Sequence, residues 1–347
     1  MTELSRTELV PGFEVSAIGF GAMALSHVYG ETDPEQAPRT LEHCLDAGVT
    51  FLDTADVYGK PRPGTEGPAG TNEELVAGLL STRRNEVQLA TKFGITGRIG
   101  SERDPDAKAT RGDRDYVRAA CEASLRRLGT DVIDLYYMHR RDLDIPIEET
   151  VGAMAELVAE GKVRHLGLSE VTGPELRAAY AVHPIAAVQS EWSLWSRDVE
   201  RNVAPTCAEL RVGFVPYSPL GRGFLTGKLT REQIASDVRA GQHRFDGDNY
   251  DVNMRAVAQI QAVADELDAT AAQVALAWLL AQGRRYGLPV VPIPGTRSPQ
   301  RIDENAAAAS LQLRDDQLAR LDAVADQVAG TRNLTFASDD WISAGRE

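Results

Sequence analysis

Short apolar runs alternate with longer segments of helical periodicity along the whole chain. The short runs are rich in β-branched residues and are bounded by turn-forming residues, which is typical of buried strands. They predict eight strands, at residues 15–20, 50–53, 87–92, 133–139, 163–169, 187–191, 213–218 and 290–293. Strands that alternate with helices usually lie parallel, and eight of them can close a barrel. The pattern therefore predicts an α/β fold, a (β/α)8 TIM barrel in which residues 1–347 form a single domain.

The longer segments predict ten helices. They lie at residues 34–47, 72–80, 114–128, 147–160, 173–182, 199–210, 253–267, 271–282, 300–309 and 315–328, so that extra helices follow the last strand at the C-terminus. Two stretches interrupt the rhythm: the Pro- and Gly-rich residues 59–72 and the longer segment 220–250. Both follow the carboxyl ends of predicted strands, where barrels place their functional loops, so we expect both to lie beside the site.

The composition is that of an ordinary globular protein, with 43% hydrophobic and 25% charged residues, and it does not indicate disorder. The formal net charge of −14 argues against a nucleic-acid or membrane partner, because such surfaces are recognised by clustered lysine and arginine. A phosphate-bearing ligand would instead need a local basic pocket. The sequence leaves open whether the chain forms a homo-oligomer.

Cysteine usage and the termini indicate a cytoplasmic protein. Cys44, Cys121 and Cys207 are far apart and have no metal-ligand spacing, so we expect three reduced, buried thiols and no metal site. The first residues carry acidic side chains and lack the basic and apolar pattern of a secretory signal. No apolar stretch reaches the roughly 20 residues that a membrane span requires.

Several predicted strands end on polar residues that a buried strand would not otherwise contain. They are Asp53, Lys92, His139, Ser169 with Glu170, Gln189, and Tyr217 with Ser218. Each residue alone could be a helix cap, a solvated charge or a satisfied core residue. In a barrel, however, strand ends converge, and buried charges need partners, so we expect these residues to share one pocket. An ammonium beside a phenol can lower the phenol's pKa toward neutrality, and a carboxylate keeps that ammonium charged.

Motifs spread over nearly the whole chain resemble the aldo-keto reductase superfamily. They are FLDTADVYG at 51–59, GFGAM at 19–23, LATK at 89–92, DLYYMHR at 134–140, GLSE at 167–170, QSEWSLW at 189–195, PYSPLGRGFLTGK at 216–228 and PIPGTRSPQRIDEN at 292–305. The resemblance implies NADPH-dependent reduction of an aldehyde or ketone. The implied catalytic residues are Asp53, Tyr58, Lys92 and His139. Tyr58 would protonate the carbonyl oxygen, Lys92 held by Asp53 would tune that phenol, and His139 would orient the oxygen.

The resemblance also implies a set of cofactor-binding residues. Tyr217 would stack on the nicotinamide, and Ser169, Glu170 and Gln189 would surround its carboxamide. Two arginines near a 2′-phosphate would favour NADPH over NADH. The remaining residues are Gly21, Ala22 and Met23 beneath the cofactor, Ser218, Leu220, Gly221, Gly223 and Lys228 around the pyrophosphate, Thr296, Arg297 and Ser298 at the 2′-phosphate, and Arg301, Glu304 and Asn305 at the adenosine.

Three features depart from the commonest pattern of that superfamily. Glu170 stands where asparagine is usual, and an ionised carboxylate can accept from the carboxamide NH₂ but cannot donate to its oxygen. Gly295 stands where many members have a phosphate-binding lysine, and residues 59–72 lengthen a loop. The sequence GLSE is similar to that of a bacterial and fungal branch with pyridoxal-reductase-like enzymes, which hints at aromatic aldehydes.

Three alternatives accompany this interpretation. The spacing of Gly19, Gly21 and Ala24 resembles a Rossmann fingerprint, but the required acidic residue falls inside a predicted helix. The same barrel also serves as a regulatory, NADPH-binding module with little turnover in potassium-channel β subunits. Finally, Tyr29, Trp192 and Trp195 could line a substrate pocket or pack between loops, since aromatic residues above a barrel do both.

Overall fold

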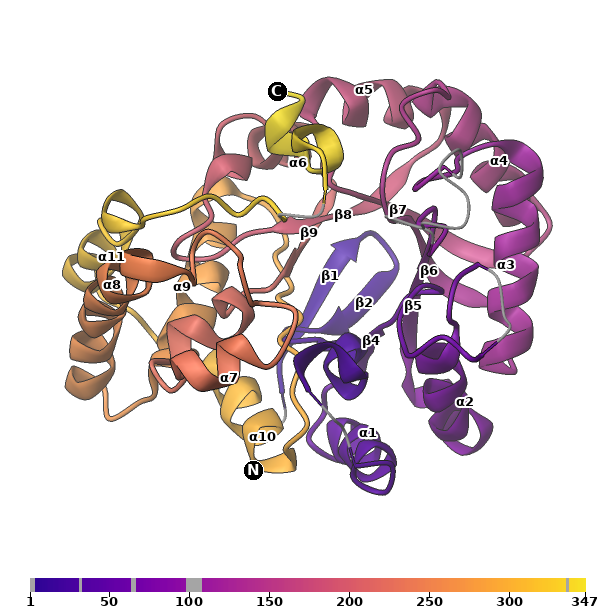
Figure 1. Ribbon diagram of the computed structural model, residues 1–347. Helices are drawn as coiled ribbons and strands as arrows, with labels where there is room; N and C mark the ends of the chain where they lie inside the picture. The colour runs from indigo at the N-terminus through magenta and orange to yellow at the C-terminus, as the bar shows by residue number, and fades with distance from the viewer. Residues whose placement is uncertain (1–3, 31–32, 64–66, 98–107, 335–336) are drawn as a thin grey trace.

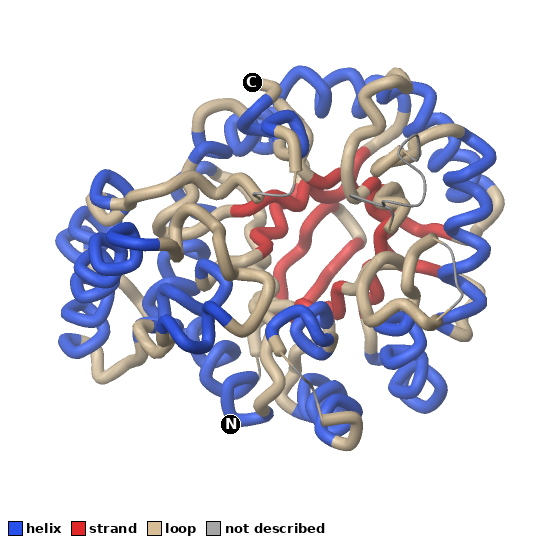
Figure 2. The backbone as a smooth tube through the Cα atoms, viewed as in Figure 1, coloured by secondary structure: helices blue, strands red, loops and turns tan. Residues whose placement is uncertain are grey.

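Seven parallel strands form a nearly closed barrel in the computed structural model, and helices surround it (Figures 1 and 2). The structure describes residues 4–30, 33–63, 67–97, 108–334 and 337–347. Each strand pairs with the next in chain order. The seven are β3 (Phe20–Gly21), β4 (Phe51–Asp53), β5 (Gln88–Phe93), β6 (Ile133–Met138), β7 (Val163–Ser169), β8 (Ile185–Glu191) and β9 (Gly213–Tyr217).

The eighth strand position is filled by residues 289–293, which do not form a regular strand. On one side the Ile293 N–H donates to the Pro216 carbonyl at 3.1 Å, and on the other the Gly19 N–H donates to the Pro292 carbonyl at 2.9 Å. The strand predicted at 290–293 is thus present only as an isolated bridge between Phe214 and Val290. Prolines within this segment have no N–H, so it cannot build a full ladder with both neighbours.

The first predicted strand, 15–20, is divided in the structure. Its beginning belongs to an antiparallel hairpin of β1 (Arg6–Val10) and β2 (Phe13–Ser16), and only its end enters the barrel as β3. The hairpin lies across the ring of strands (Figure 1), and Phe13 and Val15 pack against residues of the barrel interior. The Ser16 hydroxyl accepts from the Thr50 N–H at 3.1 Å, at the start of β4. The hairpin therefore closes the amino end of the barrel.

Helices cover the outside of the barrel in the order that the periodicity predicts. The α-helices are α1 (Gln36–Asp46), α2 (Thr71–Arg83), α3 (Arg114–Leu128), α4 (Ile147–Ala159), α5 (Gly173–Val182), α6 (Val203–Leu210), α7 (Arg231–Ala235), α8 (Gly247–Glu266), α9 (Ala271–Tyr286), α10 (Pro299–Ala307) and α11 (Asp315–Asp322). Short 3-10 helices are η1 (Ala22–Leu25), η2 (His27–Tyr29), η3 (Arg84–Glu86), η4 (Asp198–Glu200), η5 (Gly221–Thr226), η6 (Ala308–Ser310), η7 (Ala325–Gln327), η8 (Asp339–Trp341) and η9 (Ser343–Gly345). The helices predicted at 199–210 and 315–328 are each divided into an α-helix and a short 3-10 turn.

Two features of the described residues bear on the class of protein. The three cysteines are buried and free, as the sequence predicts. Among the helices that the structure describes, none combines the length and the apolar character needed to cross a bilayer.

Candidate active site

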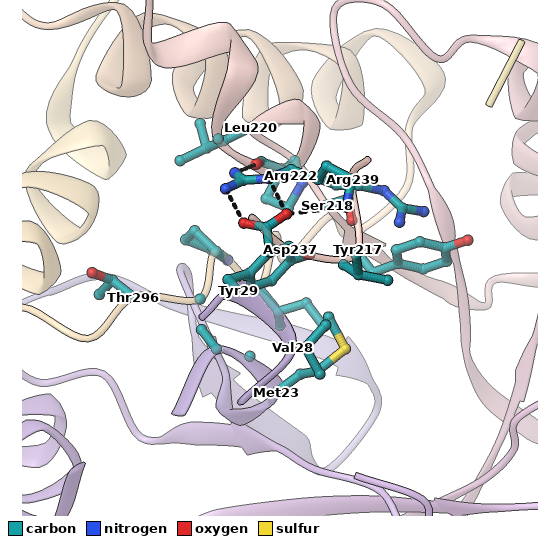
Figure 3. Close-up of a pocket in the computed structure, with 18 of the residues that line it drawn as sticks. Met23, Val28, Tyr29, Tyr217, Ser218, Leu220, Arg222, Asp237, Arg239 and Thr296 are labelled. Atoms are coloured by element: carbon teal, nitrogen blue, oxygen red, sulfur yellow. Dashed lines mark hydrogen bonds and ion pairs between the residues drawn. The ribbon is translucent and has the colours of Figure 1, made fainter. Parts of the chain in front are cut away.

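A cavity of about 770 Å³ opens at the carboxyl end of the strands. Its floor is made by the ends of four strands, which contribute Asp53, Ser169, Gln189 and Tyr217. Figure 3 shows the walls: Met23, Val28 and Tyr29 come from the segment after β3, and Ser218 to Arg239 come from the segment after β9. The volume is within the range of ordinary small-ligand sites.

The structure brings the four predicted catalytic side chains together around a buried ammonium. Lys92 Nζ lies 2.5 Å from Asp53 Oδ1, 2.7 Å from the Thr54 carbonyl oxygen and 3.3 Å from Tyr58 Oη. The Tyr58 and His139 rings meet edge to face, with centroids 5.6 Å apart. Asp53, Tyr58 and His139 line the cavity, while Lys92 lies behind them and is fully buried. Asp53 and Tyr58 thus both contact the ammonium and line the cavity, and the phenol brings an O–H group to this place.

Burial decides the protonation state of this cluster. Desolvation would lower the pKa of Lys92, but Asp53 and Tyr58 raise it above its ordinary value, so the amine stays charged. Desolvation raises the pKa of Tyr58, and the attraction of Lys92 only partly offsets this. Desolvation also lowers the pKa of His139 well below its ordinary value, with Lys92 and Arg140 adding repulsion. The expected net lowering of the phenol pKa is therefore wrong, because the pKa of Tyr58 lies above its ordinary value, and Tyr58 and His139 are both neutral at pH 7.

The lining of the cavity is basic, although the chain as a whole is acidic. Six lining residues are arginine or lysine and three are aspartate or glutamate. Arg239 donates to Asp237 at 2.9 and 2.5 Å and to the Arg222 carbonyl at 2.8 Å, and its guanidinium lies 5.3 Å from the centre of the Tyr29 ring. Arg239 thereby joins the two walls shown in Figure 3. The predicted residues Leu220, Gly223, Lys228, Thr296, Arg297, Arg301, Glu304 and Asn305 also line the cavity.

Close backbone contacts explain the glycine at position 295. A Cβ atom there would lie 2.6 Å from the Gly21 carbonyl oxygen and 2.8 Å from the Ala24 Cβ. No side chain fits without a shift of the backbone, so a lysine could not replace Gly295 in this packing. Gly21 and Gly295 both line the cavity, as does Ser218, which has a positive φ of 47°. The chain thus brings bare backbone up to the cavity, as a bulky phosphate ligand requires.

Glu170 does not face the cavity, contrary to the expectation that it contacts a carboxamide. Its carboxylate is fully buried and accepts from Arg332 at 3.0 and 3.2 Å, from the Ser343 N–H and hydroxyl at 3.0 Å, from the Tyr217 hydroxyl at 2.8 Å and from the Glu191 N–H at 3.1 Å. Burial opposes ionisation, but Arg332 and these donors hold the pKa of Glu170 well below its ordinary value. Glu170 therefore binds the C-terminal segment to the barrel.

Of the two alternatives for Trp192 and Trp195, the structure favours packing over a place in the substrate pocket, since neither contributes to the cavity. Trp192 is fully buried, donates to Glu200 at 2.9 Å and packs edge to face with Trp278. Trp195 stacks on Phe224, with ring centroids 5.1 Å apart. Large aromatic rings between strands and helices gain more from burial in the core. Of the other predicted residues, Ala22, Gly221 and Ser298 lie outside the lining, and a Cβ on Gly221 would meet the Trp195 ring at 2.6 Å.

Sequence reasoning missed four lining residues of chemical interest. They are Arg140, Arg222, Arg239 and Trp341. Arg140 directly follows His139, and Arg222 lies within the motif PYSPLGRGFLTGK, so the sequence contains a signal for both. Nothing in the sequence indicates that Trp341 reaches a cavity on the barrel, because its position depends on the contacts of the C-terminal segment with Glu170.

The segment predicted as a loop beside the site, 59–72, does not line the cavity where the structure describes it, and residues 64–66 lie outside the described part. Asn72 at its end donates to the Ala22 carbonyl at 2.9 Å and to the Ser26 hydroxyl at 2.8 Å. It therefore supports the wall of the cavity from behind. Within the described residues no group of three or more histidine, cysteine, aspartate or glutamate side chains is placed to hold a metal ion.

Comparisons with known proteins identify the family of this chain. A model of the Aldo/keto reductase family matches residues 17–326. The chain is 46% identical over 310 residues to "Probable aldo-keto reductase 1" of Glycine max, covering 88% of this chain and 84% of the relative.

Two solved structures are similar to this one over nearly the whole chain. The glycerol dehydrogenase AKR11B4 from Gluconobacter oxydans has a TM-score of 0.80 and 26% identity and covers 97% of this chain and 100% of its own. The thermostable aldo-keto reductase Tm1743, in complex with the inhibitor epalrestat, has a TM-score of 0.70 and 27% identity and covers 92% of this chain and 99% of its own.

Proposed function

The chain belongs to the aldo/keto reductase family, whose members reduce small carbonyl compounds with a nicotinamide cofactor, and we propose that it reduces an aldehyde or ketone to the alcohol with NADPH, using Tyr58 as the general acid. The observation that carries the proposal is the contact between Lys92 and Tyr58, at 3.3 Å, inside a cavity that Tyr58 and His139 both line. A protonated phenol held at a fixed place is what carbonyl reduction needs from the protein.

Each residue of the cluster has its own role in the proposed reaction. A bound nicotinamide would supply the hydride for the carbonyl carbon and would thereby be oxidised. Tyr58 gives its phenolic proton to the carbonyl oxygen, so the product is the neutral alcohol and the transient phenolate lies 3.3 Å from the Lys92 ammonium. Asp53 and the Thr54 carbonyl hold that ammonium in place. His139, being neutral, is suited to donate a hydrogen bond to the carbonyl oxygen.

Features of the cavity support NADPH as the cofactor. The Tyr217 ring lines the floor beside Ser169 and Gln189, where it offers a face to a flat ring. Arg297 and Arg301 line the distal end, and guanidinium groups suit a phosphate. The free, buried cysteines fit a reducing compartment, and we propose a cytoplasmic location.

The test is NADPH oxidation with purified protein and a panel of aromatic and aliphatic aldehydes, pyridoxal included. We expect substrate-dependent oxidation that Tyr58→Phe lowers by at least about 100-fold, while the dissociation constant for NADPH stays close to that of the native protein. Tyr180→Phe is the matched control, because Tyr180 lies on α5 outside the cavity lining. Tight NADPH binding without oxidation by any substrate would contradict the proposal and favour a regulatory binding module.

A further inference from the structure

We propose that Arg140 recognises a carboxylate on the substrate, so that the preferred substrates are 2-oxo acids or close analogues with an anionic group beside the carbonyl; this inference rests on the proposed carbonyl reduction. Arg140 lines the cavity, is 8% exposed and follows His139 directly in the chain. A nearly buried guanidinium at a catalytic cavity needs a partner for its charge.

The hydrogen bonds of Arg140 leave most of its donors unused. Nη1 donates to the His139 carbonyl at 2.8 Å and to the Ser169 hydroxyl at 3.2 Å. Nε is buried without a partner. Nη2 donates to no described residue and is not among the fully buried atoms without a partner, so it is accessible from the cavity that the residue lines. Of the five N–H groups of a guanidinium, three therefore have no partner, and the two on Nη2 are accessible.

No carboxylate of the described residues lies within 4.0 Å of the Arg140 guanidinium to neutralise it. Glu170 is near enough for the charge of Arg140 to lower its pKa, but its two oxygens already accept from Arg332, Ser343, Tyr217 and Glu191. Glu170 is thus committed to the C-terminal segment. The positive charge of Arg140 stays directed at the cavity.

The surroundings of Arg140 define the shape of the ligand. The Tyr217 and Trp341 rings lie with their centroids 5.9 and 5.7 Å from its guanidinium carbon, which holds the group between two flat surfaces. Arg140 lines the same cavity as Tyr58 and His139, and its charge lies near enough to both to lower their pKa values. A carboxylate next to a carbonyl group held by Tyr58 and His139 would therefore lie within the field of Arg140. Guanidinium and carboxylate match in geometry, whereas an ester or amide offers no charge.

Paired substrates test the inference. We compare kcat/KM for phenylglyoxylate and for its methyl ester, with NADPH, in the native protein, Arg140→Met, Arg140→Lys and Arg141→Met. The acid-to-ester ratio should fall by roughly 10- to 100-fold in Arg140→Met, as expected for loss of a charged hydrogen bond, and by less in Arg140→Lys. Arg141→Met should leave the ratio unchanged, because Arg141 bonds the Ile145 carbonyl and Glu175 away from the cavity.

If Arg140→Met does not fold, ligand binding to the native protein still tests the inference. Mandelate, the product acid, should bind the complex with NADP⁺ at least about tenfold more tightly than mandelamide. Equal binding of the two, or an acid-to-ester ratio that Arg140→Met does not change, would overturn the inference and leave carbonyl reduction intact if the ester is reduced. If neither the ester nor any aldehyde is reduced, the proposed function itself fails, and the inference fails with it.

Discussion

Replacing Arg332 with methionine should destabilise the protein through Glu170, and the loss should depend on pH. In the native structure Arg332 donates two hydrogen bonds to Glu170, whose side chain is fully buried, and two to Asp198, whose side chain is 25% exposed. Methionine keeps most of the volume but removes the charge. Water can then solvate Asp198, but it cannot reach Glu170, so a buried carboxylate is left without its counter-ion.

The stability that Arg332→Met loses has an upper limit, because Glu170 can take up a proton in the folded variant. When one member of a buried ion pair is removed, the charge left without its partner costs about 3 to 5 kcal/mol of folding stability. Protonating a carboxyl with an unfolded pKa of about 4.3 costs roughly 3.7 kcal/mol at pH 7 and roughly 1 kcal/mol at pH 5. The variant should therefore lose about 3 to 4 kcal/mol at pH 7 and about 1 kcal/mol at pH 5. In the native protein the pKa of Glu170 lies below its unfolded value, so its contribution is fully present at both pH values and disappears only in stronger acid.

Calorimetry or thermal denaturation at the two pH values measures this difference. With an unfolding entropy of about 2.1 cal/mol/K per residue over 347 residues, the loss corresponds to a Tm lower by roughly 5 °C at pH 7 and by 1 to 2 °C at pH 5. Arg177→Met is the control, because its pair with Glu209 is exposed to solvent and should contribute little to stability. Equal losses at both pH values, or a loss at pH 7 no larger than that of the control, would refute the reasoning.

Three further predictions concern the cavity. Arg301→Ala should raise the dissociation constant for NADPH by roughly tenfold and that for NADH much less, as measured by fluorescence titration; equal losses would mean that Arg301 does not contact the 2′-phosphate. The hydride-transfer step in single-turnover kinetics should be flat from about pH 6 to 8, because burial lowers the pKa of His139 and raises that of Tyr58 out of this range; a titration between these values would contradict the assigned neutral states. Gly295→Ala should cost about 1 to 3 kcal/mol of stability and weaken NADPH binding, whereas Gly78→Ala in α2, where a Cβ meets nothing within 4 Å, should stabilise the protein slightly; an alanine tolerated at 295 would show that the backbone there can shift.

The sequence predicts the barrel well because its strands are short, apolar and separated by helices of regular period. What it misses lies at the two ends of the sheet. The strand predicted at 15–20 is divided because its first half caps the barrel with a hairpin, and the segment 290–293 reaches only a bridge because of its prolines. In both places the hydrophobic pattern is that of a strand. The structure differs from the prediction because of which backbone N–H and C=O groups find hydrogen-bond partners.

The site was predictable to the extent that its residues stand at strand ends. Asp53, Lys92 and His139 are positioned by β4, β5 and β6, so their convergence follows from the fold. Glu170 also follows a strand, yet with a φ of +50° it meets Arg332, 162 positions further along the chain. No local pattern predicts such a partner. The two alternatives for Trp192 could not be separated for a similar reason, since its packing on Trp278 is a contact between distant elements.

The arginines of the cavity show why pairing, more than position, separates structural from ligand-binding groups. Arg239 and Arg140 both line the cavity and both lie against aromatic rings. Arg239 forms an ion pair with Asp237, two residues earlier, so its charge is neutralised where it joins the two walls of the cavity. The carboxylate near Arg140 is Glu170, which Arg332 has already neutralised. Because an ion pair needs no further counter-charge and an unpaired guanidinium does, an anionic ligand gains more from Arg140 than from Arg239. Glu170 therefore affects substrate binding without contacting the substrate. Because it binds the C-terminal segment, it leaves Arg140 free to bind substrate.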